Sequence, residues 1–222
     1  MKQQVDLFTP IHKAIRAMLY QLGSELQCTN IANKEECRLM VDKLEHSLEL
    51  LEEHARHEDE IIFPAIEKAL PGITEESTEE HEAYSKKVER LRALLADLKM
   101  AVRKDEIPNA MVANLRIKFT DFIAYYLLHM NHEEETLLQA SIQHLSSDEL
   151  LNVRLRVQLD TDPERYTEWL QWMLPAMDLS ELVPLFRQVR QNAPPEVAQK
   201  FDAIGNECIP EHRWNSLHEM MN

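Results

Sequence analysis

The amino-acid sequence predicts an all-α fold, an up-down-up-down four-helix bundle with additional C-terminal helices. Glycine is scarce, at 3 of 222 residues, and residues that favour helix interiors are plentiful. Apolar side chains recur every three or four residues along four long segments, which is the spacing of one helical face. Because the connections between these segments are short, neighbouring helices are expected to run antiparallel.

The first helix is expected over residues 10–28. Thr9 and Pro10 supply an N-cap and a first-turn proline, which mark its start. An inward stripe with helical spacing follows this start. Its members are His12, Ile15, Leu19, Leu22 and Leu26.

The second helix is expected to start near Asn33, which forms an N-cap and capping-box pair with Glu36. Pro64 is expected to bend this helix by removing one backbone hydrogen bond, and the Pro-Gly pair at 71–72 is expected to end it. Two polar residues interrupt its apolar face, His54 and Glu58. The rest of the stripe is Leu44, Leu48, Leu51, Ala55 and Ile62.

The third and fourth helices are separated by a predicted break at 105–109. The third begins near residue 75, and its inward stripe starts with a histidine. The fourth has a histidine and a glutamate near its end. The two stripes are His81, Tyr84, Val88, Leu91, Leu95 and Leu98, and Leu115, Phe119, Phe122, Tyr126, His129 and Glu133.

The pattern changes after residue 145, which predicts a four-helix bundle over 1–145 and a C-terminal extension over 146–222. Prolines cut the extension into about four further short helices. No ligand-like spacing occurs in it. Trp169 and Trp172 predict a strongly apolar helix face, which either docks on the bundle or binds a partner.

Charge and cysteine content narrow the function class. The formal net charge is −15, which argues against nucleic acid or an anionic membrane as a partner and favours cations. The 3 cysteines form no CxxC pattern, so neither a disulfide framework nor a cysteine zinc site is indicated. No stretch has the length and apolarity of a membrane span. These features predict a cytoplasmic protein.

Two segments share the pattern HxxHE, at 54–58 and 129–133. A residue and its i+4 neighbour lie one turn apart on the same helical face, so each segment offers an imidazole and a carboxylate together. The first and third helices each add an inward histidine near the N-terminus, His12 and His81. In an up-down bundle these ends lie beside the ends of the second and fourth helices, so all six groups are expected to gather.

Six inward nitrogen and oxygen donors predict a site for two first-row metal ions. The donors would be costly to bury without partners, and they outnumber the ligands that one ion needs. Glutamates are natural bridges between two ions. The sequence contains no ExxH, which argues against a ferritin-type site, and no HExxH, which argues against a zincin protease. A mononuclear zinc site is the alternative, and it would leave ligands unused.

This pattern resembles the hemerythrin HHE cation-binding family over about residues 8–142. The phrase HEDEIIFPAIE is also similar to the usual end of that family's second helix. The resemblance implies two iron ions (Fe2+/Fe3+) with an oxo or hydroxo bridge, held by bridging glutamates and terminal histidines. The implied ligands are His12, His54, Glu58, His81, His129 and Glu133.

The sequence departs from the oxygen-carrying hemerythrins of invertebrates, which have two histidines four residues apart on the third helix. Here the second of these positions is Ser85. The fourth-helix carboxylate of those carriers follows its histidine by five residues, so Glu134 stays an alternative to Glu133. His57 and His132 flank their stripes and stay open as additional ligands.

The expected function is that of a non-haem di-iron protein that binds or reacts with O2, NO or peroxide, in sensing, detoxification or iron handling. The alternative is a metal-stabilised regulatory protein without turnover. In that case the C-terminal helices would bind a protein partner or a second copy of the chain.

Overall fold

The computed structural model describes residues 5–30, 33–104 and 106–221. Within these residues the chain is helical and contains no strand, as the sequence predicts. Its contacts divide it into two compact units, which we call the bundle unit (Met1–Phe8 and Met18–Val157) and the C-terminal unit (Thr9–Ala17 and Gln158–Asn222). None of the described helices combines the length and apolarity needed to cross a membrane.

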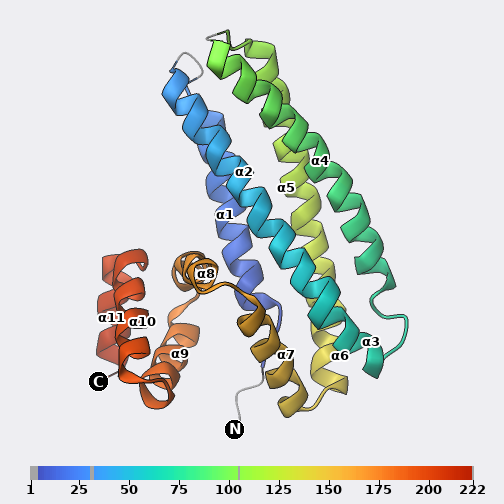
Figure 1. Cartoon of the computed structure of the whole chain (residues 1–222). Coiled ribbons are helices and arrows are strands. Elements are labelled where there is room, and N and C mark those ends of the chain that lie inside the picture. The colour runs from blue at the N-terminus through green and yellow to red at the C-terminus, as the bar shows by residue number, and fades with distance from the viewer. Residues whose placement is uncertain (1–4, 31–32, 105, 222) are drawn as a thin grey trace. The chain divides into compact units, whose positions relative to one another are not determined.

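The bundle unit contains long helices and several shorter ones (Figure 1). The helix α1 enters this unit at Met18. The long helices are α1 (Thr9–Cys28), α2 (Lys34–His57), α4 (Glu75–Lys104) and α5 (Asn109–Glu135). The shorter ones are η1 (Glu58–Ile62), α3 (Phe63–Ala69), α6 (Leu137–His144) and α7 (Ser147–Asp160).

The long helices pack in a closed ring in which neighbours run antiparallel. Three pairs of neighbouring helices have two contacts each, and in each pair later residues of one helix contact earlier residues of the other, which fixes the direction as antiparallel. The direction of α1 relative to α2, which are joined here by one contact, follows from these three pairs. This arrangement confirms the predicted up-down-up-down bundle. The contacts are Lys43 with Glu25, Arg92 with Glu52, Lys99 with Glu45, His81 with His129, Tyr84 with Phe122, the Arg116 side chain with the Leu26 carbonyl, and Gly23 with Ile123.

The predicted apolar stripes form the core of the bundle unit. Each stripe residue lies one helical turn from the next, so each helix buries a single continuous face. The members with 4% or less exposure include Leu19, Leu22, Leu26, Leu44, Leu48, Leu51, Val88, Leu91, Leu95, Leu98, Leu115, Phe119 and Phe122.

The chain passes from α2 to α3 through one turn of π-helix, η1. In this turn the backbone N–H of Phe63 donates to the Glu58 carbonyl, five residues back. Pro64 follows in the first turn of α3, where a missing N–H is tolerated. The sequence therefore placed the irregularity correctly, but its form is a wider turn rather than a simple bend.

The end of this long helical segment is fixed by side-chain capping. Gly72 has a φ of 89°, a conformation that is available to glycine without strain. The Glu67 carboxylate accepts hydrogen bonds from the Gly72 N–H at 2.5 Å and from the Thr74 hydroxyl at 2.8 Å. These bonds turn the chain into α4.

A separate apolar cluster covers the end of the bundle nearest η1. It joins the N-terminal segment to η1, α3, α6 and α7. Its most buried members are Phe8, Ile62, Phe63, Ile66, Leu137 and Leu150.

The C-terminal unit contains α8 (Pro163–Ala176), α9 (Leu179–Asn192), α10 (Pro195–Cys208) and α11 (Glu211–Met221). Asp178 and Glu181 form a capping box at the start of α9. Glu181 also pairs with Lys13 at 2.7 Å, within the same unit. The core of the C-terminal unit includes Leu170, Leu174, Leu182, Phe186, Phe201, Ile204 and Leu217.

Candidate metal centre

A buried group of histidines and glutamates lies where η1, α4 and α5 meet in the bundle unit. Glu58 begins η1, His81 lies in the second turn of α4, and His129 and Glu133 lie one turn apart near the end of α5. Each of the four offers one ligand atom, and these atoms all lie within 4.8 Å of one another. His54, the last of the five ligands predicted for this unit, adjoins Glu58 at 3.2 Å.

The ring nitrogens of this centre face the two carboxylates. The Nε2 atoms of His81 and His129 are 3.0 Å apart. The two oxygens of Glu58 lie beside different imidazoles: Oε1 is 3.2 Å from His54 Nε2, and Oε2 is 3.5 Å from His81 Nε2. Glu133 Oε2 is 3.4 Å from His129 Nε2, and Glu133 Oε1 is 3.9 Å from His81 Nε2.

The centre excludes water almost completely. Glu58 and Glu133 have no exposed surface, and His54, His81 and His129 are at most 6% exposed. Burial raises the pKa of Glu133 well above its ordinary value, and the charge of Glu58 raises it further. Metal cations would supply the positive charge that lets both carboxylates ionise in this setting.

Two further carboxylates contact the Nδ1 atoms of His81 and His129, on the side of each ring away from the centre. Asp59 Oδ1 lies 2.8 Å from His81 Nδ1, and Glu80 Oε2 lies 2.8 Å from His129 Nδ1. When each Nδ1–H donates to its carboxylate, Nε2 is left with a lone pair directed at the centre. This is the tautomer that a histidine needs to bind a metal ion through Nε2.

The environment of His81 differs from that of His129. Burial lowers the pKa of His81, but its hydrogen bonds to Asp59 and Glu58 outweigh burial and raise the pKa to about 9. Burial lowers the pKa of His129, and here the nearby carboxylates do not reverse the shift.

Sequence reasoning missed the roles of Asp59 and Glu80. Each is a direct chain neighbour of a predicted ligand, Glu58 or His81. Both lie in acidic runs, which usually form solvated surface. The sequence did offer one signal, because each of these carboxylates directly adjoins a predicted ligand. Each also lies on a helix that packs against the helix of the histidine that it contacts.

Three residues left open by the sequence lie outside the four-residue cluster. Glu134 is half-buried, whereas Glu133 is fully buried in the cluster. His57 is buried, with its Nε2 3.1 Å from an Arg56 guanidinium nitrogen. His132 lies at the rim, where its ring contacts Glu76 and Glu80 of α4.

His12, the sixth predicted ligand, is fully buried on α1. It lies in the stretch Thr9–Ala17, which belongs to the C-terminal unit. It shares a helical face with Leu19, Leu22 and Leu26, whose side chains pack in the bundle unit. Its assignment as a ligand stays a prediction.

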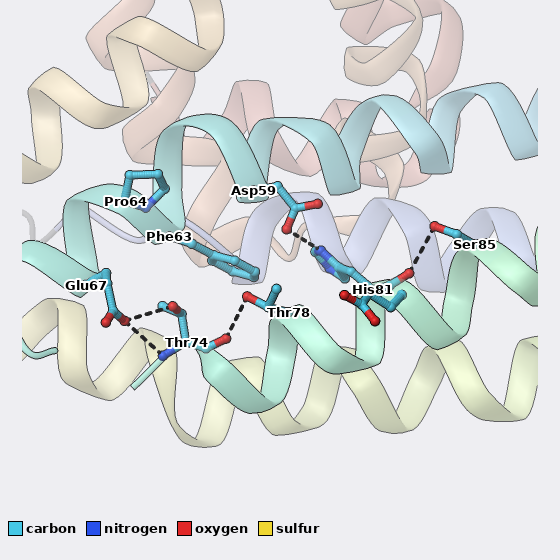
Figure 2. Close-up of a pocket in the computed structure, with 9 residues that line it drawn as sticks. Asp59, Phe63, Pro64, Glu67, Thr74, Thr78, His81 and Ser85 are labelled. Atoms are coloured by element: carbon cyan, nitrogen blue, oxygen red, sulfur yellow. Dashed lines mark hydrogen bonds and ion pairs between the residues drawn. The ribbon is translucent and has the colours of Figure 1, made fainter. Parts of the chain in front are cut away.

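A surface pocket of about 490 Å³ adjoins the centre between η1, α3 and α4 (Figure 2). His81 and Asp59 form its inner wall, and the ring of Phe63 stacks on His81 with centroids 5.3 Å apart. Ser85 also lines the pocket, and its hydroxyl donates to the His81 carbonyl at 3.0 Å. His81 is therefore shared by the pocket and the buried centre.

Comparison with known proteins agrees with this site. The family model for the hemerythrin HHE cation binding domain matches residues 3–141, which is more than half of the 222 residues. No curated protein and no solved structure matches the chain. The matched range includes the whole histidine and glutamate centre, and the chain therefore belongs to the hemerythrin HHE cation-binding family.

Proposed function

We propose that this chain is a non-haem di-iron protein that binds or reacts with a small molecule such as O2, NO or peroxide. The observation that carries the proposal is the placement of Glu58, whose two oxygens lie beside different histidines. A carboxylate placed in this way is suited to bridge two metal ions rather than to bind one.

The nitrogen positions support a division of the histidines between two ions. Two nitrogen ligands at right angles, each about 2.1 Å from one ion, lie about 3 Å apart. His81 and His129, with Nε2 atoms 3.0 Å apart, therefore suit a single ion. His54 lies on the other side of Glu58 and is proposed to serve the second ion.

The full proposed ligand set adds Glu133 as a second bridge and His12 as the partner of His54. Burial of His12 on the stripe that continues into the bundle supports this role. Imidazole and carboxylate donors together suit borderline first-row metals, and iron is the proposed occupant. Two bound irons would supply electrons for redox chemistry with a small ligand.

The side chains of this chain have distinct proposed tasks around the metals. Asp59 and Glu80 orient His81 and His129 and increase their basicity. Both glutamates of the centre are fully buried, so solvent does not compete for their oxygens. The pocket beside His81 and Ser85 provides the approach for a small molecule, because no imidazole occupies position 85.

Metal analysis combined with anaerobic absorption spectra tests the proposal. Protein produced with adequate iron is expected to contain about two irons per chain. It is also expected to change its spectrum on reduction and again on exposure to O2, NO or peroxide. One tightly held zinc ion, with no affinity for a second metal, would contradict the proposal.

A further inference from the structure

A second group of metal-ligating side chains lies at the rim of the bundle, outside the buried centre. Glu76 and Glu80 are one turn apart on the same face of α4, and His132 faces them from α5. Each of the three offers one ligand atom, and these atoms lie within 4.8 Å of one another. We call this group the rim cluster.

The contacts of the rim cluster converge on the imidazole of His132. Its Nδ1 lies 3.2 Å from Glu80 Oε2, and its Nε2 lies 3.3 Å from Glu76 Oε2. The side chain of Glu76 is 74% exposed and that of His132 is 22% exposed. An ion from solvent therefore reaches these donors directly, in contrast to the buried centre.

We propose that Glu76, Glu80 and His132 form a separate, solvent-accessible site for one divalent first-row metal ion, linked to the buried centre through Glu80. One imidazole and two carboxylates are ligands that Fe2+, Mn2+, Co2+ and Zn2+ accept. With three protein donors the ion keeps water in its remaining positions. The rim site is therefore weaker than the buried centre and exchanges its ion with solvent.

The link arises because one atom serves both groups. Glu80 Oε2 is the hydrogen-bond acceptor for Nδ1 of His129, at 2.8 Å, and also lies 3.2 Å from Nδ1 of His132. An ion that binds Glu80 at the rim withdraws electron density from this oxygen. The change reaches the Nε2 of His129, which is directed into the centre, because outer carboxylates tune the basicity of ligating imidazoles.

The link rests on the proposed di-metal function, whereas the rim site itself does not. Titration of the metal-free full chain with Co2+, followed by calorimetry and visible absorption, tests both. Wild type is expected to bind two ions tightly and a third at least about tenfold more weakly. Binding of the third ion is expected to shift the absorption of the first two.

Glu76→Gln is the informative variant, because Glu76 contacts the rim imidazole but not His129. It is expected to weaken the third site by about tenfold or more and to abolish the late absorption shift, leaving the first two sites intact. His132→Gln is expected to behave in the same way. The matched control is Glu79→Gln, which removes an exposed carboxylate of α4 outside the cluster and should titrate like wild type.

The outcomes separate the two proposals. Saturation of wild type at two ions, or an unchanged third site in Glu76→Gln, would overturn the rim site. A third ion that binds without any absorption shift would overturn the link. A single ion that is lost in Glu76→Gln but retained in Glu58→Ala would contradict the two-ion centre and still support the rim site.

Discussion

Glu58 differs from its acidic neighbours in what its carboxylate contacts. It is fully buried and lies between His54 and His81, whereas Glu60, two residues further along the chain, is exposed. Glu133 and Glu135 form a corresponding pair on α5, with Glu133 buried and Glu135 exposed. Local acidic charge is shared by all four residues, but contact with the imidazoles is not.

Substitution at these positions should therefore separate ligation from general acidity. Glu58→Ala and Glu133→Ala are each expected to lose most of their bound metal, because each removes a proposed bridging ligand. The matched variants Glu60→Ala and Glu135→Ala should retain it. Metal content after gel filtration is the measurement, and equal loss across all four variants would refute the ligand assignment.

The pair formed by Asp59 and His81 should make the stability of the metal-free protein depend on pH. The pKa of His81 is raised to about 9 in the folded chain, from an unfolded value of about 6.5. Folding therefore favours the protonated imidazole. This contribution is fully present below about pH 6.5 and is lost as the pH rises through about 9.

Asp59→Asn should reveal this dependence. In metal-free protein its unfolding midpoint is expected to lie below that of wild type at pH 6, and the difference should shrink as the pH passes 9. Thermal unfolding followed by circular dichroism at several pH values measures it, with Glu60→Gln as the control. A difference that stays constant from pH 6 to pH 10 would show that the pair does not titrate in this way.

Helical periodicity decided which residues of the candidate site could be predicted from the sequence. Five polar residues interrupt the apolar stripes, and a polar residue on a buried face needs a partner. The five are His54, Glu58, His81, His129 and Glu133. Asp59 and Glu80 lie off those stripes, so their contacts with the histidine rings depend on how the helices are rotated against each other. Periodicity within one helix does not supply that rotation.

At the scale of elements, the turn that follows α2 differs from the expected bend. A proline predicts a local irregularity, but its position relative to the preceding hydrogen bonds decides the form. Here the five-residue turn η1 ends directly before α3, and Pro64 lies in the first turn of α3, where its missing N–H is tolerated. Glu58 begins this turn, so the irregular backbone coincides with the candidate metal centre, and π-helical turns often lie at functional sites.

Metal binding should stabilise the bundle, because η1, α4 and α5 each contribute proposed ligands to one candidate centre. Removal of the metal leaves two buried carboxylates close together without the cations that offset their charge. The holo form is expected to gain about 4 kcal/mol in unfolding free energy when free metal exceeds its Kd about a thousandfold.

Thermal unfolding before and after treatment with a chelator measures this gain. Glu58→Ala provides the control, since its midpoint should respond little to added iron. Identical midpoints for the holo and metal-free wild type would contradict the proposal that the metal ties these helices together.

At the scale of the whole chain, the two units have separate cores. In the C-terminal unit, a Cβ at Gly205 would lie 2.6 Å from the Trp214 ring and 2.7 Å from the Phe186 ring. Gly23 in the bundle differs, because a Cβ there would meet only the terminal methyl of Ile123, at 3.0 Å. Aromatic rings packed in a core move less readily than a terminal methyl.

Gly205→Ala is therefore expected to destabilise the chain by about 1–3 kcal/mol through overpacking. Gly23→Ala is the matched control, and its gain in helix propensity, up to about 1 kcal/mol, should offset the tighter contact. Chemical denaturation of both variants measures the difference. Equal stability of Gly205→Ala and wild type would show that the aromatic pair repacks without cost.

The all-α class and the bundle could be predicted because each long helix carries its own apolar period. Of the predicted caps, Asn33 accepts hydrogen bonds from backbone N–H groups at the start of α2, whereas α1 begins at Thr9 without a side-chain cap.

The division of the chain into units could not be predicted. The stretch Thr9–Ala17 is the N-terminal part of α1, and its helical pattern continues into the rest of that helix. It nevertheless belongs with the C-terminal helices, through contacts such as Lys13 with Glu181. The two residues are distant in sequence, and no pattern local to either one indicates the pairing. The predicted boundary at residue 145 stays a prediction.

Reactivity toward O2 is a property of the complete centre and its access route. The six proposed ligands, two of them bridging, fill about eight of the roughly twelve positions of two six-coordinate ions. A solvent bridge would take about two more. The Ser85 hydroxyl is engaged with the His81 carbonyl and stands where oxygen-carrying hemerythrins have a further histidine, so the pocket side is left open to exogenous ligands.

We therefore expect the reduced protein to oxidise promptly in air, to react with peroxide and NO, and to show no stable oxygenated form. A carrier needs a centre that admits one ligand at one position and returns it unchanged, whereas open positions beside a solvent-connected pocket favour electron transfer to the ligand. Anaerobic reduction followed by stopped-flow mixing with O2 measures the reaction, with Glu58→Ala as the control that lacks the centre. A long-lived spectrum that is reversed by removing the gas would identify a carrier. Inertness toward all three molecules would instead favour the alternative function, in which the metal stabilises a regulatory protein.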